Sequence, residues 1–159
     1  MAPPRRLLGL AGWILLCLGV AAVSGLATME GVRSWYPTIA KPSWTPPSWL
    51  FGPVWTALYV AMGVAAWRVW RIGGFRAART ALGLFLAQLA VNGLWSPIFF
   101  AWHRLGLAVL DIGLLWLLIV ATIVAFRRHD RVAALLLLPY LAWVTFASAL
   151  TVAIWRLNG

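Results

Sequence analysis

Two amides and an indole stand on one face of the apolar stretch GLFLAQLAVNGLWSPIFF. Gln88, Asn92 and Trp95 follow one another at spacing i, i+4, i+7, which stacks their side chains along one side of a helix. A side-chain amide in hydrocarbon is costly unless it has a hydrogen-bonding partner. These amides therefore either bridge neighbouring helices or contact a ligand, and the spacing fits both interpretations.

Two further apolar stretches carry aromatic side chains on one helical face. Trp55, Tyr59 and Met62 repeat the spacing i, i+4, i+7, and Trp143 and Ala147 stand one turn apart. Faces that mix rings with hydrogen-bonding groups can line one pocket that is apolar in bulk and has a few polar anchors. The spacing therefore predicts a binding pocket between helices.

Side chains for conventional catalysis are scarce. Of the three acids, only Asp111 falls inside an expected helix, where we favour structural pairing, for example with Arg104, over a functional role. His103 and His129 lie in expected turns, and no HExxH, catalytic triad or phosphate-binding glycine loop occurs. The single cysteine, Cys17, excludes a cysteine metal cluster. We expect no metal and no required cofactor, so any chemistry would come from a bound ligand or from indole rings.

The elements that position these faces must be helices in a bilayer. Hydrophobic residues make up 64% of the 159-residue chain and charged residues 10%, values that a soluble domain of this length does not reach. Five stretches can each cross a hydrocarbon core, which needs roughly 20 helical residues: 7–27, 49–69, 80–101, 106–126 and 132–155. We expect an all-α membrane protein, a single five-helix bundle over residues 1–159, with a long first loop at 28–48 acting as a lid.

The basic residues indicate how the bundle is oriented. Of the 13 Lys and Arg residues, the amino-terminal side of the bundle holds all but four: Arg33, Lys41, Arg104 and Arg156. This bias predicts a multi-pass protein with a cytoplasmic amino terminus. We therefore attribute the net charge of +10 to membrane topology and to contact with anionic lipid headgroups, and not to nucleic-acid binding. The first stretch also has features of a cleaved signal peptide, but it is long enough to span, and we favour a spanning helix.

Three segments resemble one known family in sequence order and spacing. They are WYPTIAKPSWTPPSWLFGPVWTALY, GLFLAQLAVNGLWSPIFF, and PYLAWVTFASAL with the closing WRLN. They are similar to the translocator protein family, TspO/MBR, also called tryptophan-rich sensory proteins or peripheral-type benzodiazepine receptors. The resemblance runs from Trp35 to Asn158 and implies a five-helix membrane protein, commonly dimeric.

The resemblance also implies a ligand and a pocket. Family members bind porphyrins such as protoporphyrin IX, and some bind sterols or synthetic ligands, in a pocket under the first loop. Trp55 and Trp143 resemble its two facing indoles, which are also the photochemical candidates because some members are reported to degrade protoporphyrin in light. The full set of expected ligand-binding residues is Trp35, Tyr36, Trp55, Tyr59, Gln88, Asn92, Trp95, Trp143, Phe146 and Ala147.

The segment KPSWTPPSWLFGPVW, from Lys41 to Trp55, is then expected to be the lid. Proline fixes φ and lacks an amide hydrogen, so this segment is ordered beforehand and loses little entropy when it closes over a ligand. We expect Thr45 to cap the second helix, with Pro46 at its first position. Arg33 or Lys41 would meet the propionates of a tetrapyrrole at the rim.

One departure from the family concerns sterols. In animal members the fifth helix ends in a cholesterol-recognition pattern of Leu or Val, then Tyr, then Lys or Arg. Here Leu150 and Arg156 are present, but Val152 occupies the tyrosine position. We therefore expect no specific cholesterol site there, and a bacterial membrane fits this absence.

A small-residue face supports the dimer. Gly83, Ala87 and Ala90 form a small-xxx-small pattern that lets helix backbones approach closely, either within the bundle or between two subunits. We expect a homodimer through this face. The leading function is a membrane-embedded porphyrin-binding protein for sensing, regulation or scavenging, with or without light-dependent porphyrin degradation. The alternative is a carrier or exporter of porphyrins or lipid-like molecules.

Overall fold

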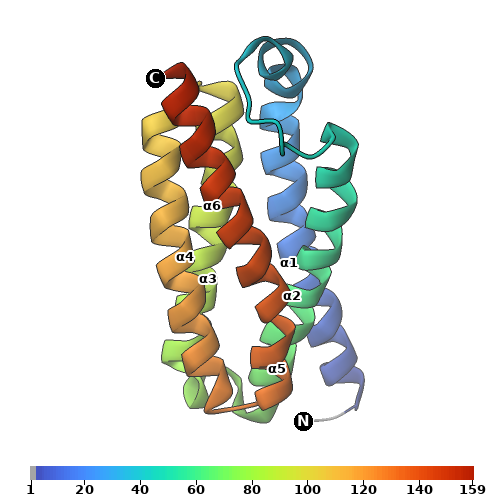
Figure 1. Ribbon diagram of the computed structural model, residues 1–159. Coiled ribbons are helices and arrows are strands. Elements are labelled where there is room, and N and C mark those ends of the chain that lie inside the picture. The colour runs from blue at the N-terminus through green and yellow to red at the C-terminus, as the bar shows by residue number, and fades with distance from the viewer. Residues whose placement is uncertain (1–2) are drawn as a thin grey trace.

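Helices carry almost all of the chain in the computed structural model, which describes residues 3–159, and no strand occurs among them (Figure 1). The α-helices are α1 Pro3–Glu30, α2 Ser48–Ala77, α3 Arg79–Ser96, α4 Leu105–Arg127, α5 Arg131–Leu136 and α6 Leu138–Asn158. A π-helical turn, Gly31–Trp35, and a 3₁₀ turn, Tyr36–Thr38, continue α1, and a second π-helical turn, Pro97–Ala101, continues α3.

Five helical segments are long and apolar enough to cross a membrane. The last span, Arg131–Asn158, consists of α5 and α6 together. The expected all-α, five-helix membrane fold is therefore confirmed. The first helical segment runs on to Thr38, beyond the expected end at residue 27, so the first loop is irregular only over 39–47.

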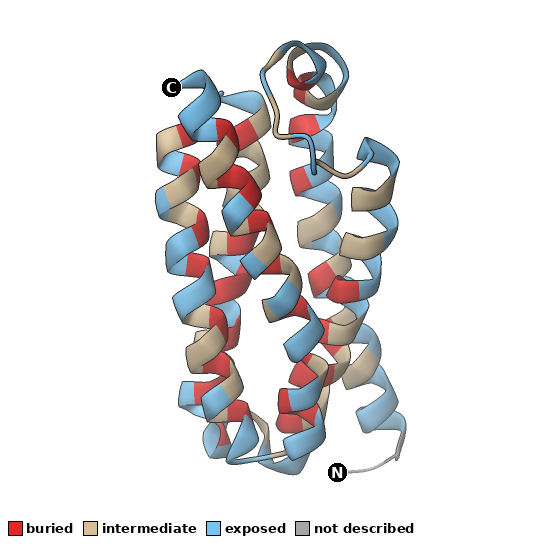
Figure 2. Cartoon of the chain, viewed as in Figure 1, coloured by how far each residue is buried: buried red, intermediate tan, exposed pale blue. Residues whose placement is uncertain are grey.

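The helices form a ring around an interior. Helix α1 packs against α2 and α3, α3 against α4, α4 against α6, and α5 returns to α2. The chain termini lie at opposite ends of the bundle (Figure 1). Buried residues gather on the sides of the helices that face inward, while the outer sides are exposed apolar surface suited to lipid (Figure 2).

Helices α1 and α2 pack tightly in the half of the bundle near the amino terminus. A Cβ added to Gly63 would lie 2.8 Å from the Cα of Ile14, so only glycine allows this approach. One turn further along α2, the Trp67 indole Nε1 donates to the carbonyl oxygen of Arg6 at 2.8 Å. These contacts fix one end of the helix pair.

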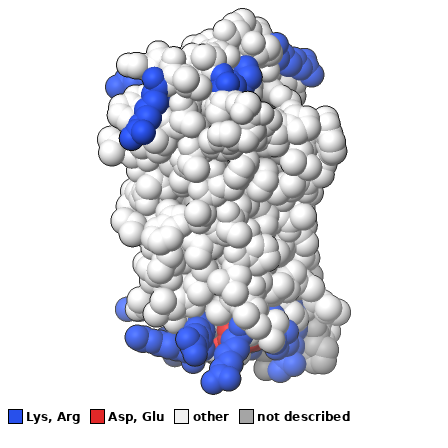
Figure 3. Space-filling model, viewed as in Figure 1, with Lys and Arg blue, Asp and Glu red and all other residues white. Residues whose placement is uncertain are grey.

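On the face shown in Figure 3, charged side chains lie at both ends of the molecule, with an uncharged belt between them. At the amino-terminal end, Arg68 Nε lies 3.0 Å from Asp130 Oδ2. Asp130 also caps α5, because its Oδ1 accepts from the backbone N–H groups of Val132 at 2.8 Å and Ala133 at 3.2 Å. Burial opposes ionisation of this carboxyl, but these hydrogen bonds and Arg68 outweigh it and lower the pKa of Asp130.

The first loop is fastened to the carboxyl end of α6. The Asn158 side chain accepts from the Ala40 N–H at 2.9 Å and donates to the Ala40 carbonyl oxygen at 2.7 Å. The Trp44 ring packs edge-on against Phe146 at 5.7 Å. The expectation that Thr45 caps the second helix is wrong, because α2 begins at Ser48 and the Thr45 hydroxyl donates to Pro42 instead.

Candidate ligand-binding site

A cavity of about 350 Å³ lies in the half of the bundle beneath the first loop. All five spanning segments contribute side chains to its wall, and Tyr36 lies at its loop end. Seven of the residues expected from the sequence line it: Tyr36, Trp55, Tyr59, Asn92, Trp95, Trp143 and Ala147. These seven residues come from four of the spanning segments and meet around one space.

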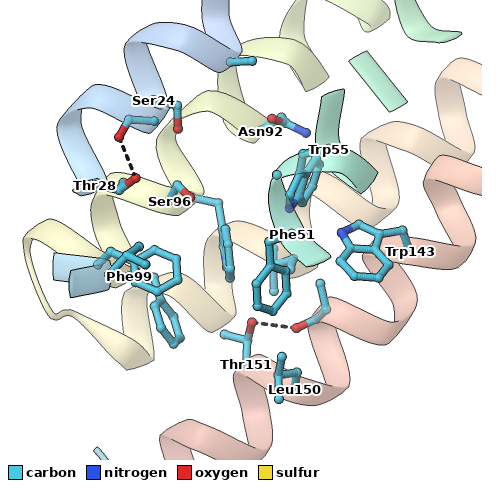
Figure 4. Close-up of a pocket in the computed structure, with 18 of the residues that line it drawn as sticks. Ser24, Thr28, Phe51, Trp55, Asn92, Ser96, Phe99, Trp143, Leu150 and Thr151 are labelled. Carbon is cyan, nitrogen blue, oxygen red and sulfur yellow. Dashed lines mark hydrogen bonds between the residues drawn. The ribbon is translucent and has the colours of Figure 1, made fainter. Parts of the chain in front are cut away.

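One wall of the cavity is aromatic and comes from α2 and α6 (Figure 4). The rings of Trp55 and Trp143 lie 6.4 Å apart at an interplanar angle of 88°. Phe51, one turn before Trp55, packs edge-on against Trp143 at 5.9 Å. Edge-to-face rings of this kind present both faces and edges to a planar guest.

The opposite wall carries hydroxyl groups from α1 and α3 (Figure 4). Ser24 and Thr28 are buried one turn apart on α1, and Ser96 stands at the end of α3. The Thr28 hydroxyl donates to the Gly25 carbonyl oxygen at 3.1 Å, which leaves its oxygen able to accept. The cavity therefore has a hydrogen-bonding side and a stacking side.

A chain of buried hydrogen bonds forms the floor. The Tyr59 hydroxyl donates to the amide oxygen of Asn92, and the Asn92 amide nitrogen donates to the Tyr140 hydroxyl at 2.6 Å. Tyr140 in turn donates to the Gln88 amide oxygen at 2.7 Å. Both amides thus bridge helices, and Asn92 also faces the cavity, so the two interpretations left open by the sequence are not exclusive for this residue.

The loop end of the cavity is closed by aromatic packing. The buried Tyr36 ring lies 6.2 Å from Phe99 and 5.2 Å from Phe100, the last two phenylalanines of the third span. A Cβ at Gly31 would collide with the carbonyl oxygen of Phe100, so the glycine lets the end of the first span rest on the third. Trp35 stands beside this closure, stacked on His103 at 4.1 Å.

Two indole N–H groups at the cavity lack acceptors. Within residues 3–159, the Nε1 atoms of Trp95 and Trp143 are buried and neither has a hydrogen-bond partner. A buried donor without an acceptor costs roughly 1–3 kcal/mol. A ligand with acceptor atoms near both groups would remove this cost, so the two donors fit a ligand-binding site.

Other expected residues lie outside the cavity lining. Gln88 is the member of the floor furthest along the hydrogen-bond chain, and its amide nitrogen also faces the Met62 sulfur at 3.9 Å. Phe146 packs behind Trp143 at 5.5 Å. At the loop, Arg33 is exposed, and the Lys41 ammonium donates to the carbonyl oxygens of Tyr36 at 2.7 Å and Ile39 at 3.1 Å.

Asp111 does not form the structural pair expected of it. No ion pair to Arg104 occurs within the described residues, and the buried Oδ2 of Asp111 has no hydrogen-bond partner there. Arg104 directly precedes α4 and is exposed, whereas Asp111 lies inside the helix and is half-buried.

Comparison with known proteins shows to which family the chain belongs. Residues 13–156 match the model of the TspO/MBR family. The chain belongs to the TspO/MBR family. It is 45% identical to a translocator protein of Homo sapiens over 89% of this chain and 84% of that protein. It is 43% identical to a tryptophan-rich protein TspO of Chlorobaculum tepidum over 97% of this chain and 98% of that protein.

A third relative, a tryptophan-rich sensory protein of Cereibacter sphaeroides, is 39% identical over 92% of both chains. The resemblance inferred from the sequence is therefore confirmed. Every residue that lines the cavity lies within the range matched by the TspO/MBR model. Together with the five candidate spans, family membership makes this an integral, multi-pass membrane protein.

The sequence did not identify the part of the TspO/MBR site that α1 contributes. Ser24, Gly25 and Thr28 line the cavity, but they lie in a stretch that reads as a plain membrane span. A signal was present, because Ser24 and Thr28 stand at spacing i, i+4 in an otherwise apolar helix. Hydroxyl groups in a span often bond only to their own backbone, so the spacing alone does not indicate a site.

Proposed function

We propose that this protein binds porphyrins of the protoporphyrin IX type, and similar flat hydrophobic ligands, in the cavity beneath the first loop. It acts in tetrapyrrole sensing, regulation or scavenging, and needs no cofactor. The observation that carries the proposal is the pair of buried indole N–H groups, of Trp95 and Trp143, that lack acceptors at the edge of an aromatic cavity. A ligand with acceptor atoms on a planar apolar frame matches both features.

The stacking wall supports a flat ligand over a flexible one. Phe51, Trp55 and Trp143 offer ring surfaces in two nearly perpendicular planes, so one contacts a planar guest face-on and another edge-on. Rigid aromatic side chains lose little conformational freedom on binding. Trp55 and Trp143 are also the residues that we assign to any light-dependent porphyrin degradation.

The assembly that we propose is a homodimer in a bacterial membrane, with the amino terminus in the cytoplasm. The small residues Gly83, Ala87 and Ala90 are exposed on α3, and a Cβ added to Gly83 would meet no atom within 4 Å. An open small-residue face suits close packing against a second copy. The Arg-rich end shared by the amino terminus supports the orientation.

The test is a titration of the detergent-solubilised protein with protoporphyrin IX in darkness, followed by tryptophan quenching. We expect saturable binding that weakens by roughly 2- to 10-fold in Trp143→Phe, because phenylalanine keeps a ring but removes the N–H donor. Trp116→Phe is the matched control, since Trp116 donates to Thr145 outside the cavity lining. Absence of saturable quenching in folded protein would overturn the proposal.

Illumination of the same samples separates binding from photochemistry. Loss of porphyrin absorbance in wild type, but not in Trp143→Phe at saturating porphyrin, would assign the light-dependent reaction to the cavity. Stable absorbance in the saturated wild type would leave binding as the activity.

A further inference from the structure

The exposed residues of the cavity lining all lie on α1 and α2, so the cavity is open on that side. Four lining residues are exposed, and all four are small: Gly25 on α1, and Ser48, Gly52 and Thr56 on α2. The three on α2 stand at spacing i, i+4, i+8 and so form one stripe along the first turns of that helix. The lining residues from α3, α4 and α6 are buried or half-buried.

Free space lies beside both α1 and α2 at the level of this opening. Near the amino terminus they touch through Gly63 and Ile14, where there is no room for a Cβ. At the other end of the pair, Cβ atoms added to Gly25 and Gly52 would meet nothing within 4 Å. Both glycines line the cavity and are exposed, so this free space adjoins the cavity.

Two other routes into the cavity, through its two ends, are obstructed. Tyr36, packed on Phe99 and Phe100, closes the loop end, and the bonds between Asn158 and Ala40 hold the loop in place. At the opposite end lies the hydrogen-bonded floor of Tyr59, Asn92, Tyr140 and Gln88. The open side belongs to spanning helices whose outer surfaces face lipid.

We propose that ligands enter and leave the cavity sideways, from within the bilayer, through the opening between α1 and α2. This inference rests on the proposed function and specifies its ligand class: amphiphiles dissolved in the membrane, whose flat apolar body passes between Gly25 and Gly52. The polar group of such a molecule stays near Ser48, where α2 begins and the N–H groups of its first turn point outward. Small side chains along the opening let a rigid ring system pass without backbone movement.

Binding kinetics in lipid vesicles test the route. Gly25→Leu and Gly52→Leu each fill the opening from a different helix, and protoporphyrin IX preloaded in the bilayer serves as the probe. We expect association and dissociation both to slow by about tenfold or more. Gly19→Leu is the matched control, because Gly19 is exposed on α1, has the same free space around it and does not line the cavity.

The kinetic outcomes separate the two proposals. Wild-type binding with unchanged rates in both variants would overturn the lateral route and leave the porphyrin site standing. Weaker binding caused by faster dissociation alone would mean that the new side chains intrude on the cavity, and this too would overturn the route. No saturable binding in folded wild type would overturn the proposed function instead.

A second measurement judges the opening without a porphyrin. A bimane fluorophore is attached to a cysteine at position 52 in a Cys17→Ala background, and quenching by lipids brominated along the acyl chain is recorded. We expect quenching close to that of a label at Gly19, and well above that of a label at buried Ala147 inside the cavity. A label at position 52 that is shielded like one at Ala147 would overturn the lateral route.

Discussion

The amide nitrogen of Asn92 on α3 donates to the hydroxyl of Tyr140 on α6 at 2.6 Å, directly beneath the cavity. Because Asn92 also accepts from Tyr59 on α2, one amide joins the three helices α2, α3 and α6. Polar groups inside a membrane bundle are held where they have partners. This network therefore fixes the depth of the cavity floor and the rotation of each helix around it.

The two tyrosines of the floor should differ in their effect on stability. The Tyr140 hydroxyl joins two amides, whereas the Tyr59 hydroxyl serves only Asn92. We expect Tyr140→Phe to lower the free energy of unfolding by roughly 1–2 kcal/mol and Tyr59→Phe by about 0.6 kcal/mol. Unfolding in mixed detergent–SDS micelles measures both, and an equal or reversed order would contradict the network.

Removing the Asn158 side chain should free the first loop. In Asn158→Leu, the Ala40 N–H and carbonyl oxygen lose their side-chain partners. We expect faster amide hydrogen exchange over residues 39–47, with unchanged exchange in the middle of α4. Ser43→Leu, an exposed substitution in the same loop, is the control. Unchanged exchange of the loop in Asn158→Leu would show that other contacts hold it.

The stability contributed by Asp130 should depend on pH. Its folded-state pKa lies below the ordinary carboxyl value of about 3.9, so the ionised form favours folding. This contribution is complete above that value and is lost as the pH falls toward the lower folded-state pKa. We expect wild type to unfold at a higher temperature than Asp130→Asn at neutral pH, and the two midpoints to converge as the pH falls below about 4.

The choice of asparagine separates charge from capping. Asparagine keeps an acceptor oxygen for the Val132 and Ala133 N–H groups, so Asp130→Asn removes mainly the ion pair with Arg68. Asp130→Ala removes the cap as well and should cost about 1 kcal/mol more at every pH. A difference between wild type and Asp130→Asn that does not change with pH would contradict the assigned role of the charge.

Arg33 and Lys41 remain our candidates for the propionates of a porphyrin. Replacing both should weaken protoporphyrin IX more than its dimethyl ester, because the ester has no carboxylate for a cation to meet. The exposed Arg33 is free to act in this way, whereas Lys41 would have to leave the carbonyl oxygens of Tyr36 and Ile39. We therefore expect Arg33→Gln to account for most of the effect, and equal weakening of acid and ester would count against both residues.

The local sequence pattern predicted many of the residues that line the cavity. The spacing of Asn92 and Trp95, and that of Trp143 and Ala147, is set by the helical repeat, so residues on one face could be grouped before any fold was known. Hydropathy located the spans, because a helix that crosses a bilayer must be long and apolar. The end of the first span was missed, since the turns over 31–38 are less apolar and contain Pro37.

The sequence alone determined that this chain is a five-helix membrane protein and which faces of three spans are chemically unusual, because both follow from periodicity along one chain. Only the tertiary structure decided which faces meet. It brought Ser24 and Thr28 to the cavity, joined Asn92 to Tyr140, and left Gly25 and Gly52 exposed in the cavity wall. Each of these depends on the rotation and separation of helices distant in sequence, which packing at contacts such as Gly63 with Ile14 sets.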